Sequence, residues 1–165
     1  MITFIDYLNE TGNSPMVINW VKNSSEWKGT FTVNSKSTQQ EFEIVISKLE
    51  ECNGVDIIQF KFFKDNSTKQ SNDNKYMWGV LSTVKKALYD YIEEMSPSML
   101  LFASSDNSNF RKAIYKLESA KLATKFDYYD VSKLDGVQDA DVLFGIYKNK
   151  EYLMCLENLI GIKLR

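Results

Sequence analysis

The chain contains no histidine, and this absence restricts the chemistry that its other residues could perform. It excludes a histidine general base, the Ser-His-Asp and Cys-His arrangements, and the commonest protein ligand for transition metals. Any chemistry would have to come from carboxylates, tyrosines, lysines, backbone amides or a cofactor. The familiar hydrolase mechanisms are therefore excluded.

The side chains best suited to contact a ligand lie in the polar segment DNSNFRKAIY, directly after a short apolar run. Asn107 and Asn109 carry amides that could bind a cofactor or substrate at the carboxyl end of a strand, where open mixed sheets tend to bind ligands. Asparagine is also a preferred residue at helix N-termini. We expect both side chains to act as helix caps first and as ligands second.

Basic residues continue along the outer part of the same predicted helix: Arg111, Lys112, Lys116, Lys121 and Lys125. Such a stripe could bind the phosphates of a nucleic acid or nucleotide. Glu118 interrupts it, and no aromatic residues are interleaved for base stacking. A solvated helix face is the favoured interpretation, and phosphate binding is the alternative.

Five aspartates follow: Asp127, Asp130, Asp135, Asp139 and Asp141. Carboxylates are ligands for hard metal ions, but the spacing is irregular and no calcium-loop pattern is present. We expect a solvated acidic rim and no metal site.

Period-two alternation predicts the strands that must position these residues. Strands are expected at 27–33, 41–49 and 55–64, joined by turn segments 34–39 and 51–54 in an antiparallel meander. Residues 1–9 suit a short helix, and 14–23 could continue it or begin a strand. The aromatic residues here are expected in the core, except Phe63, which points to the opposite strand face and could mark a partner surface.

Apolar residues then recur at spacings of three and four, which predicts a long amphipathic helix over 77–95. Asp73 or Asn74 would cap it, Pro97 would stop it, and 64–75 would form an exposed loop before it. A strand buried on both faces (98–104) and a second helix (106–126) follow. The inner stripe of the second helix is expected to be Phe110, Ala113, Ile114, Leu117 and Ala120. Strands 127–132 and 141–148 close the fold, and the tail forms a short helix or a final strand.

This order predicts an α+β fold, with a mixed, largely antiparallel sheet covered by helices. The 165 residues, 44% hydrophobic and 25% charged, suit a single domain over 1–165. The N-terminus lacks the pattern of a signal peptide, and no run reaches the roughly 18 apolar residues of a membrane span. The net charge of −2 gives no general attraction to nucleic acid or membrane.

The two cysteines, Cys52 and Cys155, lie far apart in the sequence, and neither has a second cysteine nearby. This spacing does not suit a zinc site. We expect two free thiols in a reducing cytoplasm.

The segments DNKYMWGVLSTVKKALYDYI, SMLLFAS, DNSNFRKAIYKL and KFDYYDV together resemble the core of GNAT-type acetyltransferases. In that family a strand leads into a pyrophosphate-binding loop and helix, then a strand, a second helix and a closing strand. The resemblance covers about half of the chain and implies a GNAT-like topology. It implies acetyl-coenzyme A as cofactor, Gly79, Asn107 and Asn109 as its contacts, and Tyr115 as a general acid.

The phosphate loop departs from the family pattern of Arg or Gln, two residues, Gly, one residue, then Gly or Ala. Aligned on Gly79, the chain has Tyr76 and Leu81 in the outer positions, with Met77 and Trp78 between. A phosphate needs backbone amides presented without side chains in the way.

The same region also resembles a group of small uncharacterised bacteriophage proteins. They share a helix with Ser/Thr-x-Val (here Ser82–Val84), a proline before a short strand (Pro97), Phe-x-Ala at the strand's end (here the adjacent Phe102–Ala103), and an Arg-x-x-x-Tyr helix (Arg111, Tyr115). This similarity implies a phage or prophage origin and a host bacterial cytoplasm.

An intact hydrophobic architecture without a catalytic inventory favours a phage accessory protein that is not an enzyme and needs no cofactor. It would bind a host or phage protein or a second copy of itself. The alternative is an atypical acetyl-coenzyme A-dependent N-acyltransferase. A weaker alternative is nucleic-acid or nucleotide binding through the Arg111–Lys125 helix, with Arg111, Lys112, Lys116 and Lys121 as contacts.

Overall fold

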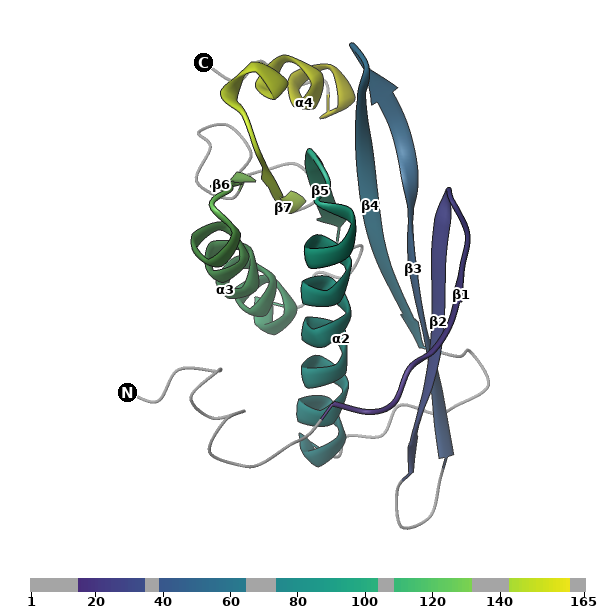
Figure 1. Ribbon diagram of the computed structural model, residues 1–165. Coiled ribbons are helices and arrows are strands. Elements are labelled where there is room, and N and C mark those ends of the chain that lie inside the picture. Colours follow the sequence, from purple (N-terminus) through teal and green to yellow (C-terminus); the bar gives the residue numbers. More distant parts are fainter. Residues whose placement is uncertain (1–14, 35–38, 65–73, 104–108, 132–142, 161–165) are drawn as a thin grey trace. The chain divides into compact units, whose positions relative to one another are not determined.

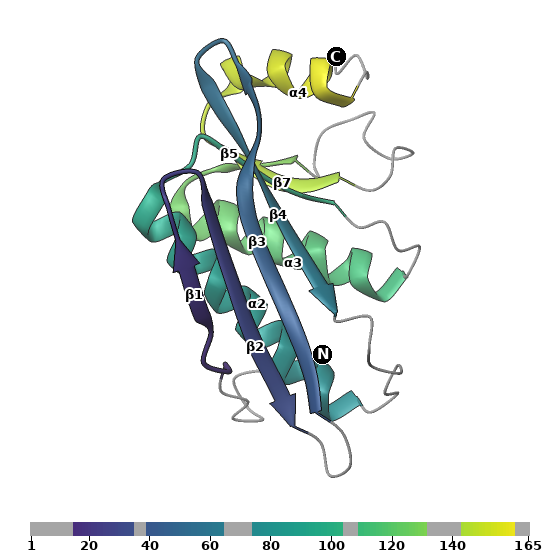
Figure 2. The same ribbon diagram turned by 90° about the vertical axis from the view of Figure 1, so that its right-hand side faces the viewer.

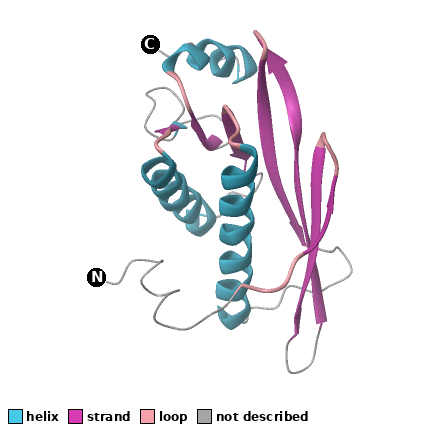
Figure 3. Ribbon diagram, viewed as in Figure 1, coloured by secondary structure: helices cyan, strands magenta, loops and turns pink. Residues whose placement is uncertain are grey.

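A computed structural model describes residues 15–34, 39–64, 74–103, 109–131 and 143–160 (Figure 1). Over these residues the chain is an α+β protein with a mixed, mostly antiparallel sheet and three α-helices (Figure 3). It forms two compact units. The first comprises described residues up to Ile46 together with Phe62–Glu94, and the second comprises Ser47–Lys61 and those from Met95 on.

The first unit begins with a hairpin of β1 (Asn19–Lys22) and β2 (Glu26–Asn34), paired antiparallel from Asn19↔Thr30 to Lys22↔Trp27. Asn23 shapes the turn, because its side-chain oxygen accepts hydrogen bonds from the backbone N–H groups of Ser25 and Glu26. Strand β3 (Gln39–Cys52) follows beside β2 (Figure 2).

Helix α2 (Asn74–Met95) packs against these strands. It ends two residues before Pro97, as the sequence predicts. Buried side chains from the strands and from the helix form the core of the first unit: Trp27, Phe31, Val33, Phe42, Ile44, Ile46, Val80, Val84, Leu88, Tyr91 and Ile92. These residues confirm the predicted inward faces of the strands at 27–33 and 41–49 and most of the predicted stripe of the long helix.

The second unit contains the order β4-β5-β7-β6. Strands β4 (Val55–Lys64) and β5 (Met99–Ala103) are parallel over Ile57↔Met99 to Phe60↔Phe102. Strand β7 (Leu143–Tyr147) is antiparallel to β5 and also to the short β6 (Tyr129–Asp130). The four residues from Met99 to Phe102 are all buried, which confirms the prediction of a strand covered on both faces.

Helix α3 (Asn109–Phe126) packs on β6 and β7, and after a turn of 3₁₀ helix η2 (Lys150–Tyr152) the helix α4 (Leu153–Ile160) completes the second unit (Figure 1). The tail therefore forms a helix, one of the two predicted outcomes. The closing strand is shorter than 127–132, because the backbone of Asp127 adopts a left-handed φ of 60° and pairing begins at Tyr129.

The inner face of α3 differs from the predicted one in its described part. Leu117 is 43% exposed, whereas Glu118 is 5% exposed and Ser119, Leu122 and Ala123 are buried. The face is rotated by about one residue because Ser119 bonds the backbone of Gly145 on β7. The predicted stripe through Leu117 is therefore wrong. Phe110, Ala113 and Ile114 have side chains outside the described part.

Candidate functional site

Most side chains of the segment DNSNFRKAIY, which the sequence marks as the best candidate to contact a ligand, lie outside the described part of the structure. Asn107 lies outside the described residues. Asn109 is the first residue of α3, and its side chain is not described. Arg111, Lys112 and Tyr115 follow in the first turns of that helix, and their side chains are also outside the described part. The structure therefore places the backbone of four candidate ligands on α3 and leaves their contacts as predictions.

Gly79 is the sixth residue of α2 and is buried. Its carbonyl accepts a hydrogen bond from Thr83 Oγ1 at 2.7 Å, and a Cβ at this position would lie 3.2 Å from Met16 Cε. Only the first four N–H groups of a helix lack intrahelical partners. The amide of Gly79 thus lies in the body of the helix, with Met16 beside it.

The described part of the basic stripe has two exposed residues, Lys116 and Lys125, with Lys121 half-buried between them. Glu118 was expected to interrupt the stripe on the outer face, but it is buried, so that expectation is wrong. A second acidic residue, Asp130, is also buried, at 7% exposure, and Asp127 is exposed. Asp135, Asp139 and Asp141 lie outside the described residues. Within the described ranges, no group of three or more metal-ligating side chains could hold an ion.

Strand β1 forms a surface that the sequence did not predict. It is the first strand in the sheet order, and among the described strands it pairs with β2 alone. Its outer side carries Val17 just before the strand and Val21 within it, 84% and 72% exposed. These residues alternate with Ile18 and Trp20, which lie inward over Gly29. We call the segment from Val17 to Lys22 the β1 edge.

The β1 edge is held at both ends, so its shape does not depend on a partner. At one end the N–H of Met16 donates to Thr83 Oγ1 at 2.8 Å. At the other, Lys22 Nζ lies 3.3 Å from Glu94 Oε2 and 3.6 Å from the centroid of the Trp27 ring. Trp27 in turn meets Tyr91 of α2 edge to face. The exposed valines therefore stand on a strand tied to α2.

The alternation of residues 17–22 and the Asn-Ser-Ser turn after them could have revealed this strand in the sequence. The prediction failed to choose between helix and strand because residues 14–23 also fit a helical continuation. Phe63, the residue expected to mark a partner surface, has its side chain outside the described part.

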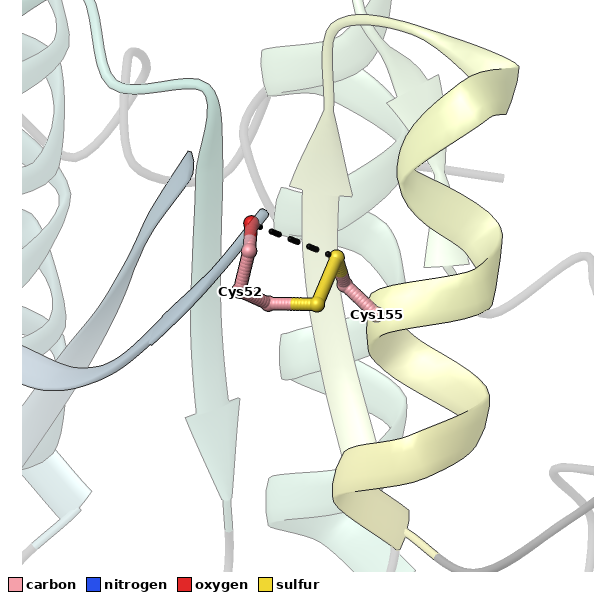
Figure 4. Close-up of a disulfide and its surroundings, with 2 residues drawn as sticks. All are labelled: Cys52 and Cys155. Atoms are coloured by element: carbon pink, nitrogen blue, oxygen red, sulfur yellow. Dashed lines mark hydrogen bonds between the residues drawn. A yellow bond between two sulfur atoms is a disulfide. The ribbon is translucent and has the colours of Figure 1, made fainter. Parts of the chain in front are cut away.

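The cysteine prediction is wrong, because Cys52 and Cys155 form a disulfide (Figure 4). Their Cα atoms are 5.7 Å apart although 103 residues separate them in the sequence. Sequence spacing could not reveal the pair, since β3 and α4 meet only through the fold of the second unit. The bond joins the end of β3 to the third residue of α4.

Cys155 lies in the core of the second unit, which also contains Ile57, Met99, Leu101, Val131, Tyr147 and Leu156. Cys155 is 3% exposed, whereas Cys52 is half-buried at the edge of this cluster. Of the two cysteine residues, Cys52 is therefore the more exposed to solvent.

No protein-family model matches this chain, and neither a curated protein nor a solved structure matches it. In the described part of the chain, no helix has the length and apolar character to cross a membrane.

Proposed function

We propose that this chain is a non-enzymatic accessory protein of a bacteriophage, working in the host cytoplasm by protein–protein binding or self-association. The observation that carries the proposal is the β1 edge. A strand at the edge of a sheet offers unpaired backbone N–H and C=O groups, and adding another strand is a recurrent mode of protein recognition. Val17 and Val21 add apolar contact area on the same segment.

The charge at this edge also supports binding. Natural edge strands are commonly protected by an exposed lysine. The lysine of β1, Lys22, is turned onto Trp27 and paired with Glu94. Its charge is thereby partly neutralised at the end of the strand, and Val21 stays accessible.

Self-association is the simplest form of this proposal, since two β1 strands could pair with each other across a twofold axis. Light scattering after size exclusion tests it directly. We expect a species heavier than one chain, and we expect Val21→Lys to reduce it to the monomer, because a second lysine would meet its own copy across the axis. The matched control is Met154→Lys, which changes another exposed apolar side chain, on α4.

The alternative function is an acetyl-coenzyme A-dependent N-acyltransferase with a GNAT-like topology. The order β4, α2, β5, α3 and β6 supports it, since this is the order that the family resemblance implies. The position of Gly79 inside α2 argues against its role as a phosphate contact. The test is thermal unfolding with acetyl-coenzyme A: a ligand of the folded state raises the melting temperature, whereas a non-enzyme shows no change.

Nucleic-acid binding through α3 remains the third and weakest candidate, supported by exposed Lys116 and Lys125. Binding of labelled DNA and RNA at low and high salt would test it, because contacts with phosphate lose affinity steeply as salt rises.

A further inference from the structure

The disulfide connects the β3–β4 hairpin to helix α4. The two elements differ in the other interactions that stabilise them. Cys52 is the last residue of β3, directly before the two-residue turn Asn53-Gly54. Both turn residues have positive φ, 52° and 79°, as a tight hairpin of the type-I′ class requires. Lys48 Nζ lies 2.9 Å from Glu51 Oε2 on the same strand and 3.1 Å from Asp56 Oδ1 across the hairpin on β4. The hairpin therefore keeps its form without the disulfide.

Helix α4 gains little stability from its own length. It has eight residues, and isolated helices shorter than about 12–15 residues are marginal in water. Its described contacts with the core of the second unit run through Cys155 and Leu156, with Leu153 and Tyr152 packed beside them. In the described part of α4, this short packed face and the covalent bond hold the helix on the core of the second unit.

From this asymmetry we propose that the Cys52–Cys155 disulfide is a redox-controlled clasp. Oxidised, it holds α4 on the core of the second unit. Reduced, it releases α4 and uncovers that core while the β3–β4 hairpin stays folded. The inference is independent of the β1 edge and takes from the proposed function only the bacterial cytoplasm, where disulfides that do occur are usually transient or redox-sensing.

The reductant is a dithiol. One of its thiolates attacks Sγ of Cys52, the less buried of the two residues, which forms a mixed disulfide and expels Cys155 as a thiolate. Cys155 then takes up a proton. The second thiolate of the reductant then attacks the reductant sulfur that is bonded to Cys52 in the mixed disulfide. This step releases Cys52 as a thiolate, which also takes up a proton. Two electrons pass to the protein, and the dithiol becomes a cyclic or bridged disulfide.

A hydrogen-bond acceptor lies close to the sulfur of Cys155. Cys155 Sγ lies 3.5 Å from the carbonyl oxygen of Cys52, the contact drawn in Figure 4. When α4 returns to the core, the Cys155 thiol can donate to that oxygen, which places its sulfur beside Cys52 for the disulfide to re-form under oxidation. The clasp is therefore reversible.

The test uses the purified full chain, with dithiothreitol as the dithiol. Native protein is reduced, alkylated and examined by mass spectrometry, and amide hydrogen exchange is compared between the oxidised and reduced forms. We expect complete alkylation without denaturant, with Cys52 modified first. We also expect reduction to speed exchange in α4 by a factor at least about ten times larger than in β5, whose exchange follows only the global stability of the chain. Cys52→Ala should give fast α4 exchange with and without dithiothreitol.

Three results would overturn the clasp. The bond could resist dithiothreitol until the chain is denatured. The fully alkylated chain could keep the slow α4 exchange of the oxidised form. Exchange in β5 could rise by the same factor as that in α4, which would make the bond a structural support of the whole second unit. None of these results bears on the β1 edge, whose test is the oligomeric state of the oxidised chain.

Discussion

Ser119 on α3 and Gly145 on β7 hold each other through two hydrogen bonds with the same hydroxyl. Ser119 Oγ donates to the Gly145 carbonyl at 2.7 Å and accepts from the Gly145 N–H at 3.2 Å. Both residues are buried. The pair satisfies a backbone N–H and a backbone C=O that would otherwise be costly to bury, and it sets the rotation of α3 on the strands.

Gly145→Ala should destabilise the chain by at least about 3 kcal/mol, because overpacking against fixed backbone cannot be relieved by a rotamer change. A Cβ at this position would lie 2.3 Å from the carbonyl oxygen of Leu100 on the neighbouring strand β5. Urea unfolding measures the loss. Gly54→Ala is the matched control, since its Cβ would meet nothing within 4 Å and the cost is only the strain of its positive φ, about 1–2 kcal/mol. Equal losses for the two variants would contradict the packing argument.

Reduction of the disulfide should lower the stability of the chain by about 2–5 kcal/mol, the usual range when a native disulfide is removed. The long separation of 103 residues makes the loop-closure contribution large. For a chain of 165 residues this corresponds to a fall in melting temperature of roughly 10 °C. Calorimetry with and without dithiothreitol measures it. Cys52→Ala provides the control, because its melting temperature should not respond to dithiothreitol.

Stability should fall as the pH rises above about 10, the ordinary pKa of tyrosine. Burial raises the pKa of Tyr128, and burial followed by the negative charges of Tyr129 and Asp130 raises the pKa of Tyr147. The folded state therefore keeps protons that the unfolded chain loses, so this contribution is complete below the unfolded pKa and is lost as the pH passes the folded one.

Urea unfolding at about pH 9 and about pH 11 measures this alkaline loss. Tyr147→Phe should make the decline shallower, because phenylalanine cannot ionise. A decline as steep as that of the unsubstituted chain would show that other groups cause it. The Tyr129→Phe variant is a useful comparison, since that ring stacks on Tyr147 but is exposed.

The regular part of the fold could be predicted from the sequence because its periodicities are strong. The alternation in 27–33 and 41–49 and the three-four spacing in 77–95 each place one apolar face inward, and burial of Phe31, Ile44 and Val84 confirms them. The α3 face could not be predicted in this way. Its orientation depends on Ser119 meeting Gly145, a contact between residues 26 positions apart that no local pattern reveals.

The candidate sites were harder to predict for the same reason. The disulfide depends on the second unit bringing the end of β3 to α4, and the exposed valines of the β1 edge have the same residue type as buried core residues. Val21 and Val33 are both valines in strands, yet one is 72% exposed and the other 3%. Only their places in the sheet distinguish an exposed surface from a core.

The oligomeric state of the oxidised chain, compared with that of its Val21→Lys variant by light scattering across a wide range of concentration, tests the proposed role of the β1 edge most directly. We predict that the unsubstituted chain and the Met154→Lys control associate to the same mass, and that Val21→Lys is a monomer that keeps the circular dichroism spectrum of the folded chain. A monomer for the unsubstituted chain at every concentration, or association that survives Val21→Lys, would contradict self-association through this edge.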